Sequence, residues 1–82
     1  EFGWSDLGTW GSLHTLTAHD EWNNAVIGDN VLMIESSGCM VRVPHQKRVV
    51  IQGLKDCIIA EHKDTLLICQ MNEEQRIKEW NH

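Results

Sequence analysis

The sequence predicts a mostly β fold with a short helix near each end. Three observations favour this fold class: six short β-prone runs, turn-forming residues between the runs, and apolar residues at helical spacing near both termini. The runs cover residues 25–27, 31–35, 39–43, 48–52, 57–61 and 66–71. Strands of this length, with turns every 8–12 residues or so, fit a β-sandwich, a small barrel or a solenoid.

The two predicted helices flank these runs. The first covers residues 9–16, where apolar residues recur at every third position, and the polar stretch 17–24 that follows is expected to be a loop. The second covers residues 72–80, with Asn72 as its N-cap. Its apolar residues, expected to dock it on the strands, are Met71, Ile77 and Trp80. Its charged residues, expected to form a solvated face, are Glu73, Glu74, Arg76, Lys78 and Glu79.

An internal repeat links the two halves of the strand region. Residues 32–41 align with residues 58–67 at an offset of 26, and glycines precede both copies at nearly the same spacing. Two strands, a tight turn and a glycine bend therefore occur twice. Such a repeat fits coils of a solenoid, whose exposed edges the flanking helices would cover, but periodicity alone leaves the sandwich and the barrel open.

Composition narrows the class of protein. Eighty-two residues make one domain at most, and a net charge of −5 with scattered lysines and arginines argues against binding nucleic acid. No apolar run approaches the roughly 20 residues that span a bilayer, and no signal-peptide pattern opens the chain, so no membrane partner is expected. Three cysteines in apolar runs, without a C-x-x-C pair, predict buried free thiols and a reducing, cytoplasmic location.

Most sequence signals for catalysis are missing. The histidines lack metal-site spacing to one another and to the cysteines, so they are expected to be solvated side chains. No G-x-S-x-G elbow or Cys/His pair predicts a nucleophile. The glycine-rich opening is followed by no G-K-[ST] and preceded by no strand, which excludes a Walker loop and a dinucleotide fingerprint.

The opening run is the exception. Asp6 lies between two tryptophans and two glycines, just before the first predicted helix. It is either an N-cap or a ligand: Gly3 and Gly8 leave space beside the carboxylate, and Trp4 and Trp10 either wall that space or belong to the core. Mg²⁺ is usually held by one or two carboxylates together with substrate phosphates, so Asp6 needs a partner from elsewhere to bind it.

The same run resembles the signature F-x-W-[SN]-D-[VL]-G-[ST]-W of bacterial mannose-1-phosphate guanylyltransferases. It reads Phe2-Gly3-Trp4-Ser5-Asp6-Leu7-Gly8-Thr9-Trp10. The resemblance continues through residues 20–29, which are similar to the family's D-x-x-x-N-x-x-x-G-D stretch, and through residues 44–45, 49–56 and 64–69. It implies that residues 19–82 form a small left-handed parallel β-helix with a closing helix. Residues 1–18 are then the tail end of a nucleotidyltransferase catalytic domain and its linking helix.

The resemblance also implies a reaction and a site. These enzymes join mannose 1-phosphate to GTP and release pyrophosphate, giving GDP-mannose. Asp6 is the implied catalytic residue and one ligand of the Mg²⁺ cofactor, paired with an aspartate of an N-terminal catalytic domain that this sequence lacks. Ser5, Gly8 and Thr9 are the implied substrate-binding residues. The 82-residue chain alone is expected to be inactive.

Two other interpretations stay open on the sequence. The chain fits a structural or oligomerisation β-helix module, in which Asp6 only caps a helix and the partner is the catalytic domain or a second copy in a homodimer. It also fits part of another sugar-phosphate nucleotidyltransferase, because guanine and mannose rest on the resemblance alone.

Overall fold

The structure, a computed structural model, describes residues 10–80. One helix, α1 (Trp10–Leu16), precedes six strands, and a helical segment closes the chain. The strands are β1 (Ala25–Ile27), β2 (Val31–Ile34), β3 (Met40–Arg42), β4 (Val49–Gln52), β5 (Cys57–His62) and β6 (Thr65–Gln70). The closing segment is a 3₁₀ helix, η2 (Met71–Arg76), followed by α2 (Ile77–Trp80). The mostly β prediction, the first helix and the six strands are therefore confirmed.

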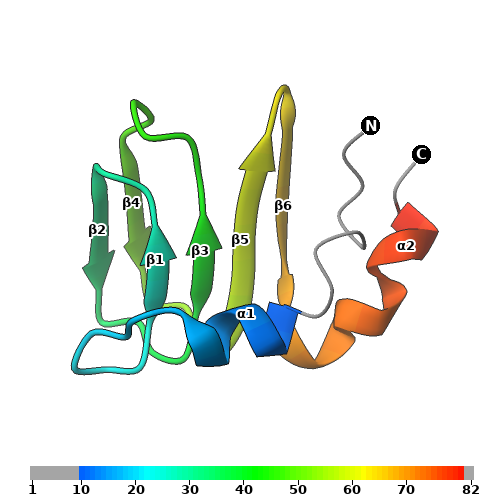
Figure 1. The fold of residues 1–82 in the computed structure, drawn as a ribbon, viewed down its shortest axis with the longest axis horizontal. Helices are drawn as coiled ribbons and strands as arrows, with labels where there is room; N and C mark the ends of the chain where they lie inside the picture. Colours follow the sequence, from blue (N-terminus) through cyan, green and yellow to red (C-terminus); the bar gives the residue numbers. More distant parts are fainter. Residues whose placement is uncertain (1–9, 81–82) are drawn as a thin grey trace.

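The strands form two sheets through which the chain passes alternately (Figure 1). One sheet has the order β1-β3-β5-β6, and the other pairs β2 with β4. The pairs β1–β3, β3–β5 and β2–β4 are parallel and join strands that are not consecutive in sequence, as in stacked coils. Only β5 and β6 form an antiparallel hairpin among the described residues. This topology favours the solenoid over the sandwich and the barrel, and its left-handedness stays a prediction.

The offset between paired strands is eighteen residues for β2–β4 and β3–β5, where Val31 pairs with Val49 and Met40 pairs with Ile58, and fifteen for β1–β3, where Ala25 pairs with Met40. The predicted repeat of 26 is wrong as a structural period. Its two copies begin in β2 and β5, which lie in different sheets, and only the second copy is a hairpin. The similarity reflects apolar runs around polar turns, whereas the register is set by which side chains face the coil interior.

Backbone corners repeat with the same eighteen-residue period. Glu35 and Gly53 have φ of 51° and 77°, and Gly38 and Asp56 have φ of 68° and 53°. These left-handed conformations turn the chain from one sheet toward the next. Glycine adopts them without steric cost, whereas Glu35 and Asp56 adopt them despite their side chains. Glycine punctuation alone therefore reveals only half of the corners.

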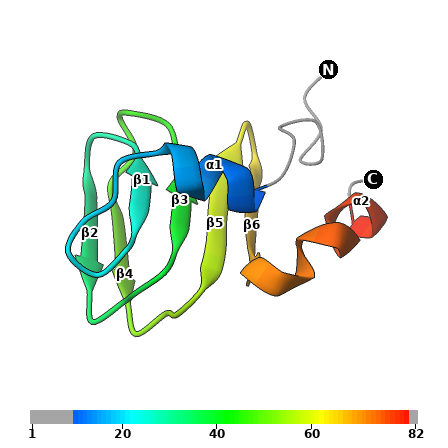
Figure 2. The ribbon, with the colours of Figure 1, turned by 60° about the horizontal axis from the view of Figure 1, so that its bottom comes forward.

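Two apolar clusters lie on opposite faces of the four-stranded sheet. Along β5, Ile58 and Ala60 face the first cluster, which also contains Trp10 of α1, whereas Ile59 faces the second cluster inside the coil. This alternation follows from the two-residue period of a strand. Helix α1 lies at the lower ends of the strands in Figure 1 and in front of β3 and β5 in Figure 2, and its Trp10 packs on the sheet face outside the coil.

The closing segment differs from its prediction. It begins one residue earlier, as a 3₁₀ helix, and its N-cap is Gln70, whose side chain makes no capping hydrogen bond. The amide of Met71 donates to the carbonyl of Asp56 at 2.7 Å, which starts the helical turn directly after β6 and leaves Asn72 inside it. Ile77 and Met71 pack on the first cluster as predicted, but Trp80 is 41% exposed and does not dock.

The three cysteines are free, as predicted, but only one of them is fully buried. Cys39 lies inside the coil, whereas Cys57 and Cys69 are half-buried on β5 and β6. None of the helices in the described part of the chain has the length and apolar content that crossing a membrane requires.

Candidate functional site

The site residues predicted from the sequence, Ser5, Asp6, Gly8 and Thr9, lie outside the described residues, so their roles stay predictions. The structure does place the residue that ends the opening run. The side chain of Trp10 is 1% exposed and belongs to the first apolar cluster. Of the two roles considered for Trp10, a wall beside Asp6 or a core residue, the structure supports the core residue.

The backbone of Trp10 is also held. Its amide nitrogen donates a hydrogen bond to Oε2 of Glu74 at 3.0 Å, across 64 residues of sequence. Glu74, expected on a solvated helix face, is therefore half-buried against the start of α1. No local pattern predicts this contact, because it depends on where the coil brings the end of β6.

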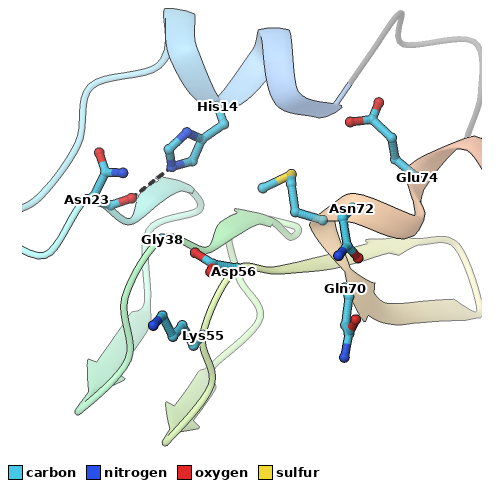
Figure 3. Close-up of a pocket in the computed structure, with 9 residues that line it drawn as sticks. His14, Asn23, Gly38, Lys55, Asp56, Gln70, Asn72 and Glu74 are labelled. Atoms are coloured by element: carbon cyan, nitrogen blue, oxygen red, sulfur yellow. Dashed lines mark hydrogen bonds between the residues drawn. The ribbon is translucent and has the colours of Figure 1, made fainter.

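A polar cavity of about 720 Å³ lies beside this contact (Figure 3). Helix α1 borders it on one side, the turns between coils on another, and the start of η2 on a third. It is lined by His14, Asn23, Gly38, Lys55, Asp56, Gln70, Met71, Asn72 and Glu74. Its wall includes Glu74, whose carboxylate accepts the hydrogen bond from the Trp10 amide.

Three of these residues, Asn23, Gly38 and Asp56, form a column that we call the corner residues. Each has positive φ and precedes a strand of the four-stranded sheet by one or two positions. The amides of two of them join successive coils by donating to carbonyls of the preceding coil: Gly38 N donates to Trp22 O at 3.1 Å, and Asp56 N donates to Ser37 O at 2.9 Å. Their strained backbone is therefore explained by the turns of the coil and is no evidence of catalysis.

The cavity offers hydrogen-bonding groups of both charges. Nε2 of His14 donates to the carbonyl of Asn23 at 2.7 Å, while Asp56, Glu74 and Lys55 bring carboxylates and an ammonium group to the wall. Within residues 10–80, no three or more histidine, cysteine or acidic side chains come close enough together to hold a metal ion.

Two of the three thiols, those of Cys39 and Cys69, are poor nucleophiles. Burial raises the pKa of the Cys39 thiol and of the Cys69 thiol, which favours the protonated, unreactive form of both. Cys39 also lies within 3.7 Å of the carbonyls of Ser37 and Leu54, as expected for a small apolar side chain with a weak donor. These cysteines are structural.

Residues 17–24 form a loop, as predicted, and its hydrogen bonds over residues 20–24 make a clip that holds the first coil. Oδ1 of Asp20 accepts hydrogen bonds from the amides of Trp22 and Asn24, each at 2.9 Å. The Asn24 side chain is buried, donates to Ser36 O at 2.8 Å and accepts from Cys39 N at 3.0 Å. Desolvation raises the pKa of Asp20, but the hydrogen bonds from Asn24 and Trp22 and the nearby His19 outweigh it and lower that pKa overall.

The comparisons with known proteins decide the family. Residues 29–80 match the family model of the MannoseP isomerase/GMP-like β-helix domain. The chain belongs to this β-helix family. The stacked parallel coils described above are the structural counterpart of that assignment, and the resemblance drawn from the opening run and the later strands is confirmed.

Curated relatives match a larger share of this β-helix family member than residues 29–80. A Vibrio cholerae protein, provisionally named a mannose-1-phosphate guanylyltransferase, is 37% identical over 93% of this chain. The alginate biosynthesis protein AlgA of Pseudomonas aeruginosa is 36% identical, and the mannose-1-phosphate guanylyltransferase of Escherichia coli is 32% identical, each over 93% of this chain. The chain spans only 15–16% of the length of these relatives.

A solved structure supports the fold of this β-helix. The protein titled mannose-1-phosphate geranyltransferase from Thermus thermophilus superposes with a TM-score of 0.66 over 92% of this chain. The match covers 22% of that protein at 22% sequence identity, so it supports the assignment of the fold alone.

Proposed function

We propose that this chain is part of an enzyme that transfers GMP from GTP to mannose 1-phosphate, giving GDP-mannose and pyrophosphate. The observation that carries the proposal is the match of 93% of the chain to proteins named as mannose-1-phosphate guanylyltransferases. The opening run with Asp6, which resembles the family signature, supports the same assignment. The free thiols fit the cytoplasm, which we propose as the location.

In this proposal the chemistry belongs to residues before Trp10 and to a catalytic domain that this sequence lacks. A phosphate oxygen of mannose 1-phosphate attacks the α-phosphorus of GTP, and the bond to pyrophosphate breaks. Mg²⁺ would neutralise and orient the phosphates, with Asp6 as one of two aspartate ligands. Ser5, Gly8 and Thr9 would contact the sugar phosphate, and residues 10–80 would serve as scaffold.

The test is GDP-mannose synthesis by the full-length enzyme carrying Asp6→Asn. Loss of a group that stabilises transition-state charge costs about 10²–10³-fold in kcat, so a loss of at least that order is expected. Asp29→Asn is the matched control, because Asp29 is exposed and its contact is an ion pair with His45 at 3.0 Å. Normal Mg²⁺-dependent turnover by Asp6→Asn would refute the role of Asp6, and turnover by the 82-residue chain alone would refute its inactivity.

A second candidate function, self-association through the end of the coil, is favoured by the structure around β4. The eighteen-residue repeat would place residues 67–70 beside β4, but these residues turn back as β6 on β5. Strand β4 therefore pairs only with β2 among the described strands. The amides of Val49 and Gly53 donate toward β2, so by strand alternation the amides of Val50 and Gln52 point to the open edge.

Apolar side chains line this open edge. Val50, Leu66 and Ile68 are each more than half exposed and border a groove of about 470 Å³ that leads to the buried Ile51 and Ile59. A second copy is the occupant we propose, because a two-fold axis would pair β4 with its own equivalent and satisfy the same edge on both chains.

Sedimentation velocity over a range of protein concentrations tests this second function. The expected result is a dimer that Ile68→Lys converts to a monomer, because the lysine would place a charge in the buried contact. Leu16→Lys is the control, since Leu16 is an exposed apolar residue on α1, away from the groove. A strict monomer, or a dimer that both variants leave intact, would refute the proposal.

A further inference from the structure

Two cysteines occupy equivalent positions in neighbouring coils. Strand β3 pairs with β5 at an offset of eighteen residues, and the isolated parallel bridge between Ser37 and Lys55 has the same offset. The register therefore holds on both sides of Cys39 and places it directly beside Cys57. Their thiols have equivalent contacts: Cys39 Sγ lies 3.6 Å from the Ser37 carbonyl oxygen, and Cys57 Sγ lies 3.3 Å from that of Lys55.

Both of these thiols face the interior of the coil. Cys39 is buried in the second apolar cluster, and half-buried Cys57 packs against the same cluster. Cys69 instead packs on the first cluster, on the opposite face of the sheet, and pairs with Ile58 across the hairpin. Because strand side chains alternate between the two faces, Cys69 is separated from the other two thiols by the sheet itself.

The other side of Cys39 is occupied by Asn24. The pairing of Ala25 with Met40 places Asn24 beside Cys39, and the buried Asn24 side chain accepts a hydrogen bond from the Cys39 amide at 3.0 Å. In the part of the chain that the structure describes, Cys57 is thus the one cysteine that the register places beside Cys39.

The spacing of the coils suits a covalent bond between these two side chains. Hydrogen-bonded strands lie about 4.8 Å apart, and disulfides join residues whose Cα atoms are usually about 4.4–6.8 Å apart. The equivalent orientation of the two side chains means that rotation about the Cα–Cβ bonds brings the sulfurs toward each other.

We propose that Cys39 and Cys57 form a reversible disulfide, which joins the second coil (β3 and β4) to the third coil (beginning with β5) when the protein meets a low-molecular-weight disulfide. The Cys57 thiolate attacks one sulfur of that disulfide, and one small thiolate leaves. Cys39 then loses its proton and attacks the Cys57 sulfur of the mixed disulfide, so that the second small thiolate leaves. Two protein thiols are oxidised, the small disulfide is reduced to two thiols, and the cysteine protons end on those thiols.

Burial decides which cysteine reacts first. Cys57 is half-buried and can be reached by a small reagent, whereas Cys39 is fully buried and its burial raises the pKa of its thiol. Once Cys57 carries the mixed disulfide, attack by Cys39 is intramolecular, and its proximity offsets its weak ionisation. A disulfide of this kind is transient in a reducing compartment, which fits the free thiols of the structure.

The experiment equilibrates the native full-length protein with mixtures of reduced and oxidised glutathione, alkylates the remaining thiols and maps the disulfides by mass spectrometry. Trypsin cleaves after lysine and arginine, so the three cysteines fall in three peptides, one ending at Arg42, one covering residues 56–63 and one covering residues 64–76. The expected product is a cross-link between the first two peptides that dithiothreitol removes. Cys69 is expected to stay outside the cross-link.

Single variants test the proposed order of the steps. Cys57→Ser should abolish the cross-link, and Cys39→Ser should leave Cys57 as its mixed disulfide with glutathione, which identifies the intermediate. Cys69→Ser is the matched control, because Cys69 is also half-buried but faces the other cluster, and the cross-link should form as in the wild type.

Three outcomes would overturn the inference. They are native wild-type protein in which Cys39 and Cys57 both stay free under oxidised glutathione, a cross-link that joins Cys57 to Cys69, and a link between Cys39 and Cys57 that forms only in urea. All three are read on the wild-type protein, so a variant that does not fold leaves the test decisive. None of these measurements depends on GDP-mannose synthesis, so the inference stands or falls separately from the proposed function.

Discussion

Replacing Asn24 by alanine should remove the clip that joins the first two coils. The Asn24 side chain is 1% exposed, and its amide donates to the Ser36 carbonyl at 2.8 Å while its oxygen accepts from the Cys39 amide at 3.0 Å. Alanine leaves that carbonyl and that amide buried without this partner. It also removes a 3.1 Å hydrogen bond from the amide to Asp20 Oδ2.

The expected cost follows from these contacts. An unsatisfied buried polar group costs about 1–3 kcal/mol, so the two backbone groups together cost about 2–6 kcal/mol. A domain of this size has a total free energy of unfolding of about 4–12 kcal/mol. Asn24→Ala is thus expected to remove a large fraction of the stability and to lower Tm by about 10 °C or more.

Urea unfolding followed by tryptophan fluorescence and circular dichroism measures this loss. Asn72→Ala is the matched control, because Asn72 is exposed in η2 and the change there should stay within about 0.5 kcal/mol. A loss below about 1 kcal/mol for Asn24→Ala, with an unchanged m-value, would refute the argument that this side chain holds the coils together.

Two further predictions concern the same end of the coil. Asp20→Asn should destabilise the chain at pH 7. Because the folded-state pKa of Asp20 is lowered, the difference in stability from wild type should shrink as pH falls below the ordinary value of 3.8, and it should vanish below the folded-state pKa. Thermal unfolding between about pH 2.5 and 7 measures this difference, and a difference that stays constant with pH would contradict the prediction. Gly38→Ala should cost more stability than Gly53→Ala. Both glycines have positive φ, but a Cβ at Gly38 would lie 2.1 Å from Oδ1 of Asp56, whereas a Cβ at Gly53 would have no atom within 4 Å. In an Asp56→Ala background the two glycine changes should cost about the same, and a persistent excess at Gly38 would show that the clash is not with that carboxylate.

The sequence predicted the strands well because their signal is local. Alternating or continuous apolar residues between polar turns located all six strands to within one or two residues. The coil period was not predicted, because the pairing of Met40 with Ile58 is a property of the stacked register. The left-handed corners at Glu35 and Asp56 were not predicted either, because a glycine marks only the equivalent corners of the neighbouring coils, at Gly53 and Gly38.

Long-range polar contacts were equally hidden. Asn24 reads as one more polar residue in a loop, and Glu74 reads as one more charge on a helix, yet each binds a backbone group of a distant segment. Side-chain hydrogen bonds to backbone depend on the packed arrangement of the coils, which no window of the sequence contains. The resemblance of the opening run and the later strands predicted the β-helix family correctly, since such a motif compares whole segments.

Trp10 lies at the boundary between the described scaffold and the run to which we assign the chemistry. On one side, residues 10–80 supply packed coils, protonated structural thiols and a polar cavity, and no cluster of potential metal ligands is found among them. On the other side lies the run with Asp6, the residue to which we assign the chemistry. The buried indole and the hydrogen bond from the Trp10 amide to Glu74 hold the residue at which the described scaffold begins.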